Sequence, residues 1–197
     1  MHPAEHVADT AGEPAGNQGA GSRDAGGRDA GGPDGERSDL AAFHQLVGQL
    51  DYPMLIVTTS VAGEHSGCLV GFHTQCSIDP PRFLVCVSHR NHTFPLALAS
   101  ELLAVHVLDV ADHRLAELFG ERTGDDVDKF AACAWREHHG LPVLSAVKAW
   151  FIGRVLHRLD CGDHTGHLLE PIQAEFSGEL HQLGFQQVKT LNPGHPS

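Results

Sequence analysis

A run of small and polar residues between Gly67 and Pro81 could hold a planar ligand. Read as a β-strand, its first half points alternate side chains to opposite faces of a sheet. One face carries Cys68, Val70 and Phe72, which would point into the core, and the other carries Leu69, Gly71 and His73. A glycine on the second face lets a flat ring or another backbone come close. The residues alone leave two interpretations open: a ligand groove, or the irregular end of a strand.

Two polar segments flank the next apolar run. Thr74-Gln75-Cys76-Ser77 precedes it, just ahead of a rigid double proline, and Asn91-His92-Thr93 follows it. Thr93 is a predicted helix N-cap, and the amides at a helix start favour a phosphate. Arg90 beside it could supply positive charge to the same phosphate. Plain helix capping is the alternative interpretation of this segment.

Gly162-Asp163-His164 is a third candidate for chemistry. An imidazole can hydrogen-bond an anionic ring or a carboxamide, and its charge changes near neutral pH. His164 is therefore the candidate catalytic residue, with a turn histidine that bonds only backbone as the alternative. The sequence holds 16 histidines, but His164 and His167 would point to opposite faces of a strand, so no metal site is expected.

Short β-rich runs must position these segments. The predicted strands are Met54–Ser60, Gly67–Thr74, Phe83–Ser88, Leu102–Leu108, Trp150–Arg158 and a last one from about Thr165. Three helices are predicted. The first has Ser38 as its N-cap and ends before Tyr52-Pro53, the second runs from Thr93 to Ala99, and the third follows Asp112. Six short strands with a few small helices predict an all-β to α+β fold, a closed antiparallel split β-barrel.

The chain divides into three predicted parts. Residues 1–38 form an acidic tail rich in Gly, Ala and Asp, with too few apolar residues to offset chain entropy, so disorder is expected. Residues 39–176 form the barrel, and residues 177–197 form a C-terminal arm that packs on it.

Composition narrows the function classes. A net charge of −12 with 13 scattered basic residues argues against binding nucleic acid. No apolar run approaches the roughly 20 residues of a membrane span. Five cysteines without a C-x-x-C pair, together with a polar N-terminus, predict a cytoplasmic protein with reduced thiols. No Gly-rich dinucleotide fingerprint is present, so a nicotinamide would bind only transiently.

The order of these segments resembles the FMN-binding split barrels of the flavin reductase-like family. That family carries Gly-x-Thr-x-Ser-Ser-Phe-x-Ser-x-Ser-x-x-Pro-Pro, then an apolar strand, an Asn-x-Thr or Ser-x-Thr turn, and later Gly-Asp-His. Gly67, Thr74–Ser77 and Pro80-Pro81 are in step with the first pattern, and Asn91-His92-Thr93 and Gly162-Asp163-His164 match the later ones. Leu69, Gly71 and Phe72 stand where the reductases have hydroxyl residues, as in the domains fused to flavodiiron proteins.

The resemblance implies a flavin-binding oxidoreductase that reduces FMN, or FAD, with NADH or NADPH. It implies a homodimer with the flavin at the subunit interface, and leaves room for an electron-accepting partner protein. The implied cofactor-binding residues are Leu69, Val70, Gly71, Phe72, Thr74, Gln75, Cys76, Ser77, Arg90, Asn91, His92 and Thr93. Two alternatives stay open: an FMN-holding electron-transfer protein without NAD(P)H activity, and a barrel that binds another planar cofactor such as haem or a deazaflavin.

Overall fold

A computed structural model of the chain describes residues 33–124 and 127–192. The compact unit comprises residues 43–197, and the residues before it form a separate unit. Helix α1 (Pro33–Val47) begins in that first unit. Ser38 therefore lies inside a helix that starts five residues earlier, and the predicted N-cap at Ser38 is wrong. The rest of the predicted tail lies outside the described residues.

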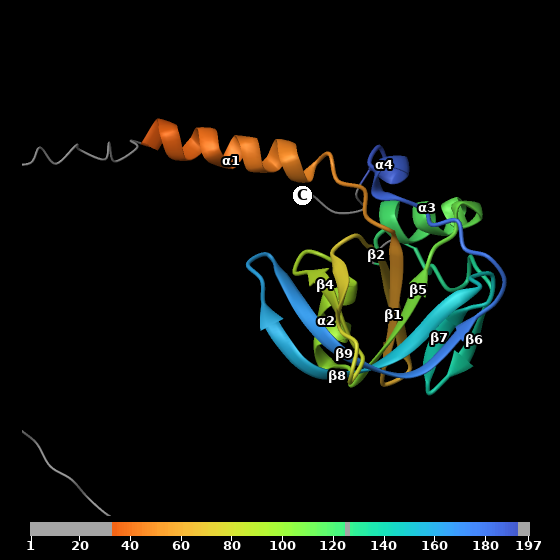
Figure 1. The fold of residues 1–197 in the computed structure, drawn as a ribbon. Helices are drawn as coiled ribbons and strands as arrows, with labels where there is room; N and C mark the ends of the chain where they lie inside the picture. Colours follow the sequence, from red (N-terminus) through yellow and green to blue (C-terminus); the bar gives the residue numbers. More distant parts are fainter. Residues whose placement is uncertain (1–32, 125–126, 193–197) are drawn as a thin grey trace, which may run out of the picture. The chain divides into compact units, whose positions relative to one another are not determined.

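One antiparallel sheet of seven strands forms the body of the unit (Figure 1). The strands are β1 (Leu55–Val61), β2 (Glu64–Val70), β3 (His73–Ser77), β4 (Arg82–Ser88), β5 (Leu102–Val107), β8 (Ala149–Asp160) and β9 (His164–Phe176). Their order across the sheet is β2-β1-β5-β8-β9-β4-β3. The long β8–β9 hairpin therefore joins a β1–β2–β5 half to a β3–β4 half.

The predicted closed barrel is not found, although the mostly antiparallel sheet with short helices is. The two edges of the sheet are β2 and β3, which follow one another in the chain but pair with different strands. Two residues, Gly71 and Phe72, separate them and break the single strand predicted over 67–74. One backbone hydrogen bond near the break runs from the Cys86 amide to the Phe72 carbonyl, over 2.9 Å. A break without a β2–β3 ladder leaves the sheet open at this point.

Short helices and a second hairpin complete the unit. Helix α2 (Thr93–Ala99) matches its predicted bounds, and a 3₁₀ turn η1 (Val110–Asp112) leads into α3 (His113–Glu121). The two-stranded sheet β6 (Trp135–His138) and β7 (Leu141–Leu144), and helix α4 (Phe185–Val188), were not predicted. None of the helices in the described part of the chain is long and apolar enough to span a bilayer.

The core consists of apolar clusters on the inside of the sheet. The first includes Val57, Cys68, Val70, Val85 and Leu169. The second packs α3 and the C-terminal segment against the sheet, and includes Ile56, Leu108, Phe119, Leu183 and Val188. Cys68 and Val70 thus face the core as predicted, whereas Phe72 beyond the strand break is 56% exposed. The core-facing position predicted for Phe72 is wrong because alternation stops at Gly71.

A buried histidine on β5 joins strand β1 to the β6–β7 hairpin. The His106 side chain is fully buried, and its Nε2 atom accepts a hydrogen bond from the Leu144 amide at 3.0 Å. The Nδ1 atom must therefore carry the proton, which it donates to the Ile56 carbonyl at 3.0 Å. Burial lowers the pKa of His106 to about 4, so this ring stays neutral and structural.

Candidate functional site

A largely apolar cavity of about 340 Å³ opens at the break between β2 and β3. Its size lies within the range of small-molecule and cofactor pockets, roughly 300–1,000 Å³. Several of its walls come from segments singled out in the sequence: Leu69, Val70, Gly71, Phe72, Asn91 and His164. The remaining walls include Tyr52, Met54, Cys86, Ser88 and Phe185. Segments far apart in the chain therefore meet at one hollow with few polar groups.

The end of β2 forms one wall of this cavity. A Cβ atom added to Gly71 would lie 3.7 Å from the Met54 side chain, which is ordinary van der Waals contact. The protein itself therefore leaves space for a side chain at residue 71. At Gly67, by contrast, a Cβ atom would come within 2.9 Å of Phe119, so packing alone requires that glycine. Of these two glycines of β2 and its end, Gly71 is the one that leaves open surface for a ligand ring.

His164, the first residue of β9, forms another part of the cavity wall. The strand register places it directly across from Ser88, the last residue of β4. Its Nδ1 atom lies 2.7 Å from the Asp163 carboxylate, and its ring packs on Phe72 with centroids 5.1 Å apart. The hydrogen bond from His164 lowers the pKa of Asp163, so this carboxylate stays ionised and orients the imidazole.

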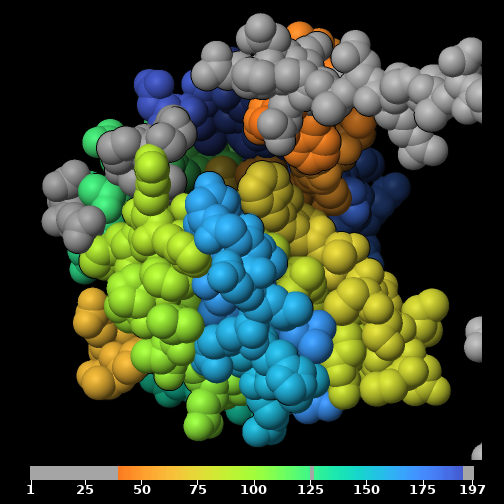
Figure 2. Space-filling view, turned by 90° about the vertical axis from the view of Figure 1, so that its left-hand side faces the viewer, coloured from red at the N-terminus to blue at the C-terminus, as the bar shows by residue number. Residues whose placement is uncertain are grey.

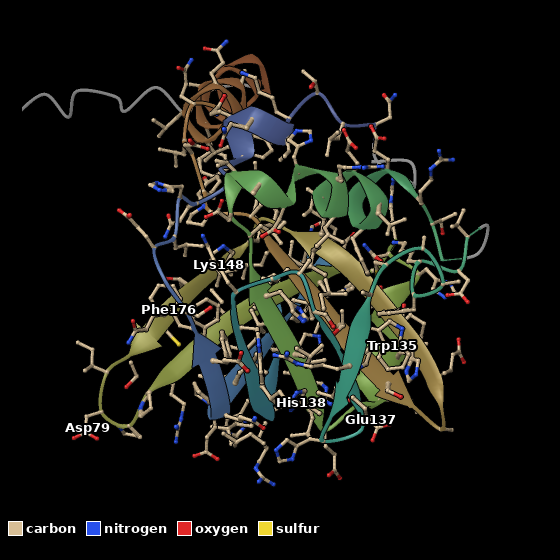
Figure 3. All side chains as sticks on the ribbon, turned by 90° about the vertical axis from the view of Figure 1, so that its right-hand side faces the viewer. Asp79, Trp135, Glu137, His138, Lys148 and Phe176 are labelled. Carbon is tan, nitrogen blue, oxygen red and sulfur yellow. The ribbon has the colours of Figure 1, made fainter. Side chains whose placement is uncertain are left out.

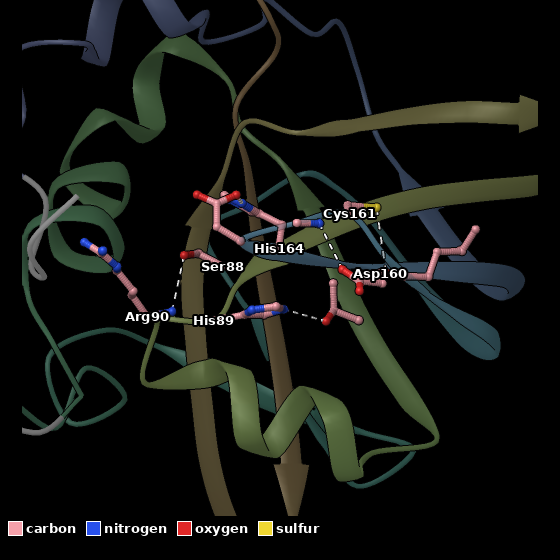
Figure 4. Close-up of polar contacts among 10 residues, drawn as sticks. Ser88, His89, Arg90, Asp160, Cys161 and His164 are labelled. Carbon is pink, nitrogen blue, oxygen red and sulfur yellow. Dashed lines mark hydrogen bonds and ion pairs between the residues drawn. The ribbon is translucent and has the colours of Figure 1, made fainter.

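The loop after β4 is held by its own hydrogen bonds. The Asn91 amide donates to the Ser88 carbonyl and the Arg90 amide to the Ser88 hydroxyl, at 3.0 and 3.3 Å. His89 bonds the Thr165 hydroxyl at 3.0 Å, as Figure 4 shows. These contacts fix Asn91 against the cavity wall beside β9.

Thr93 does not play its predicted part as an N-cap. It is the first residue of α2, and the position before it is His92, whose side chain makes no capping hydrogen bond. The Asn91 side chain instead accepts from the Thr93 amide at 3.0 Å. Thr93 is 1% exposed, and its hydroxyl accepts from Ser66 inside the protein. Asn91 rather than Thr93 supplies the side-chain oxygen at this helix start.

The other predicted binding residues lie elsewhere in this chain. Gln75, Cys76 and Ser77 line a shallow hollow at the tip of the β3–β4 hairpin, together with Asp79. Figures 2 and 3 show this hairpin, with Asp79 at its tip, projecting from the rest of the unit. Thr74 belongs to the same hairpin, and its hydroxyl bonds the Gln75 carbonyl. Within one chain, the fold does not bring this set to the cavity of Gly71 and His164.

A second cavity, of about 640 Å³, lies on the other side of β2 and takes in His92. Beside it the buried Lys129 ammonium donates to the carbonyls of Gly67 and Phe119, at 3.1 and 3.2 Å. Burial lowers the pKa of this lysine, and both bonds hold β2 against α3. The part of the chain that the structure describes contains no group of three or more His, Cys, Asp or Glu side chains suited to a metal ion.

Sequence reasoning missed several cavity residues. Ser88 and Cys86 end an apolar strand, and only the register with β9 shows that they face the site beside His164. Phe185 comes from a helix that was not predicted. Strand parity could have indicated Cys86 and Ser88, because residues two apart share a face. Nothing in the local sequence signals Phe185.

The comparisons with known proteins agree with this fold. The flavin reductase like domain family matches residues 47–190, and the chain belongs to this family. The chain is 29% identical over 149 residues to the stachydrine N-demethylase reductase subunit Stc3 of Rhizobium meliloti (strain 1021), which covers 75% of this chain and 63% of that subunit. It is 27% identical over 123 residues to the FMN reductase (NADH) RutF of Stutzerimonas stutzeri (strain A1501), covering 62% of this chain and 70% of that protein.

Solved structures show the same fold. The NADH:FAD oxidoreductase SgcE6 of Streptomyces globisporus C-1027 superposes with a TM-score of 0.68 at 22% identity, covering 81% of this chain and 91% of that one. The chain spans 63% of the length of Stc3 and 49% of a second relative from the same strain.

Proposed function

We propose that this protein is a flavin reductase, which transfers a hydride from NADH or NADPH to FMN. One observation carries the proposal: the end of β2, the Ser88–Asn91 loop and His164 converge on one apolar cavity. Membership in the flavin reductase like domain family supports it. The FMN reductase (NADH) RutF among its relatives favours FMN, and the NADH:FAD oxidoreductase with the same fold keeps FAD as the alternative flavin.

The cavity residues fit an isoalloxazine ring. Leu69, Val70 and Phe72 give apolar walls, and the bare face of Gly71 lets a flat ring approach the backbone of β2. Asn91 and Ser88 add a few polar atoms at the rim, as cofactor pockets require. We assign the phosphate to the exposed loop around Arg90, whose guanidinium suits a phosphate.

The bound flavin supplies the hydride acceptor, so the protein needs no obligatory acid or base. The side chains of the cavity orient the ring and exclude water from its apolar side. His164, oriented by Asp163, would offer a hydrogen bond to the flavin at the cavity rim and stabilise the negative charge of its reduced form. Its proposed role is to position and stabilise, and the nicotinamide binds transiently over the exposed face.

Two copies of the chain complete this proposal. The β3–β4 hairpin projects from the unit and carries Ile78 at 86% exposure, and Phe72 beside the cavity is also exposed. We propose a cytoplasmic homodimer in which the hairpin residues Thr74–Ser77 approach the partner's flavin. We also propose that the reduced protein passes its electrons to a partner protein, since Stc3 is named as a reductase subunit.

Titration and turnover measurements test the function together. FMN added to the purified full chain should lose fluorescence on binding at micromolar concentrations, and NADH oxidation should depend on added or bound flavin. Absence of quenching by both FMN and FAD would contradict the proposal. Flavin binding without NADH or NADPH oxidation would instead identify an electron-transfer flavoprotein. A purified protein whose visible spectrum is that of haem or a deazaflavin would identify another planar cofactor.

A further inference from the structure

Two cysteines from separate elements meet at the rim of the cavity. Cys86 lies on β4 and lines the cavity wall. Cys161 lies exposed in the turn between β8 and β9, and Cys86 is only partly buried. All five cysteines of the chain are free thiols in the structure, so nothing in the fold already pairs these two.

Gly166 on β9 makes this meeting possible. It is the register partner of Cys86 across the β4–β9 ladder. The Cys86 amide donates to Phe72, on the side away from β9, so Cys86 and Gly166 form a non-hydrogen-bonded pair. Opposed residues in such pairs have their Cα atoms about 4.5 Å apart, the closest spacing in an antiparallel ladder. Gly166 has no side chain to fill the space beside Cys86.

The sulfur of Cys161 occupies that space. A Cβ atom on Gly166 would lie 3.3 Å from the Cys161 Sγ atom, so the sulfur sits over the glycine and next to Cys86. The turn is fixed there by the Cys161 amide, which donates to the His164 carbonyl at 3.0 Å. The bare glycine therefore leaves room for the thiol of the β8–β9 turn to lie within reach of the thiol on β4.

The two thiols differ in their surroundings. Burial and the neighbouring Cys161, which shares a hydrogen bond with Cys86, together raise the pKa of the Cys86 thiol to about 11. Cys161 is exposed to solvent, and its Sγ atom also lies 3.7 Å from the Leu159 carbonyl. Since oxidation follows access and thiolate character, Cys161 is the thiol that an oxidant reaches first.

We propose that Cys86 and Cys161 form a reversible disulfide when hydrogen peroxide oxidises this protein. Reduced flavin reacts with dioxygen, and hydrogen peroxide is the two-electron product of that reaction. Only the source of the peroxide rests on the proposed function. The pairing of the two thiols follows from the fold. Transient disulfides of this kind occur in reducing compartments as redox-responsive sites.

The reaction balances in two steps. The Cys161 thiolate attacks one peroxide oxygen, the O–O bond breaks, and the departing hydroxide takes up a proton to give the first water and a sulfenic acid at Cys161. The Cys86 sulfur then attacks the Cys161 sulfur, the S–O bond breaks, and the hydroxyl leaves with the Cys86 proton as the second water. The two thiols lose two electrons in total, and the peroxide gains them.

Peptide mass spectrometry on the full chain tests the pairing. The reduced protein, free of flavin and nicotinamide, is treated with hydrogen peroxide, its remaining thiols are blocked, and it is digested. We expect one linked pair of peptides that contains Cys86 and Cys161 and separates on reduction. Conversion of Cys161 to sulfinic acid while Cys86 stays a thiol, or a bond from Cys161 to another cysteine, would overturn the proposal.

Three variants make the test specific. Cys86→Ser should leave Cys161 as a sulfenic acid that dimedone traps, whereas Cys161→Ser should leave Cys86 unmodified. Cys76→Ser removes an exposed cysteine on the β3–β4 hairpin and should leave the disulfide intact. A second arm replaces peroxide with NADH, FMN and air. If the disulfide forms with added peroxide but not with NADH, FMN and air, the result would count against the proposed function. It would still confirm that Cys86 and Cys161 form a disulfide.

Discussion

The Ser66 hydroxyl on β2 donates a hydrogen bond to the Thr93 hydroxyl at the start of α2, over 3.0 Å, and both side chains are buried. This bond joins the strand that ends at the cavity to the helix that follows the Ser88–Asn91 loop. The end of β2 and the Ser88–Asn91 loop both line the proposed flavin site. The buried Ser66–Thr93 hydrogen bond therefore helps to keep these two segments at a fixed distance from each other.

Replacing Thr93 by Val should lower the stability of the fold more than its affinity for flavin. The variant keeps the side-chain shape but leaves the buried Ser66 hydroxyl without its acceptor, which costs about 1–3 kcal/mol. Urea unfolding measures this loss, and FMN titration of the same variant gives the affinity. Ser66→Ala is the matched partner, and the double variant should lose less than the sum of the single losses. Unchanged stability would show that the bond contributes nothing.

Gly71→Ala should weaken flavin binding without destabilising the protein. The added methyl group meets Met54 at an ordinary contact distance of 3.7 Å but occupies the face proposed for the ring. We expect a loss of about tenfold or more in FMN affinity, equivalent to roughly 1.4 kcal/mol, with a melting temperature close to that of the parent.

Gly67→Ala is the control for this position, because its Cβ atom would come within 2.9 Å of Phe119 inside the core. That variant should lose stability first. If Gly71→Ala binds FMN as tightly as the parent, the ring does not lie against the end of β2.

His164→Ala should slow NAD(P)H oxidation about 10–100-fold and leave FMN affinity nearly intact. A group that stabilises developing negative charge acts more in the transition state than in the ground state. Asp163→Asn keeps the imidazole but removes the charged partner 2.7 Å from its Nδ1 atom, and should give a smaller effect in the same direction. A lower melting temperature with normal turnover would make His164 a purely structural turn residue.

Stability should fall as the pH drops from about 6.5 to about 4. Burial lowers the pKa of both His106 and His167 to about 4 in the folded protein. The unfolded chain takes up these protons first, near pH 6.5, so each histidine costs up to about 3 kcal/mol by the bottom of that window. Asp109, whose pKa is lowered by its hydrogen bond with Lys148, contributes in the same direction, and its contribution is lost only at lower pH.

Urea unfolding measured across this range checks the pH dependence. His106→Asn should flatten part of the slope, because it removes one buried group that titrates. A free energy of unfolding that does not change between pH 6.5 and 4 would show that these rings are not held neutral in the fold.

The sequence by itself determined the local elements and the family. Helix α2 has its predicted bounds, and β1, β4, β5, β8 and β9 lie within a few residues of the predicted runs. These elements follow from patterns that are local in the chain: alternating apolar residues, turn residues and prolines. The spaced segments from Gly67 to His164 indicated the flavin reductase-like family, to which the matching residues 47–190 assign the chain.

Only the tertiary structure decided which residues share a site. The alternation of side chains along β2 ends at Gly71, so Phe72 is exposed. The edge strands β2 and β3 do not pair with each other, so the sheet does not close into a barrel. The Thr93 side chain is buried and accepts a hydrogen bond from Ser66, a residue far from it in the sequence. Pairing of β4 with β9 set Ser88 opposite His164 and Cys86 opposite Gly166. Register between distant strands is a property of the whole sheet, and no local pattern in either strand specifies its partner.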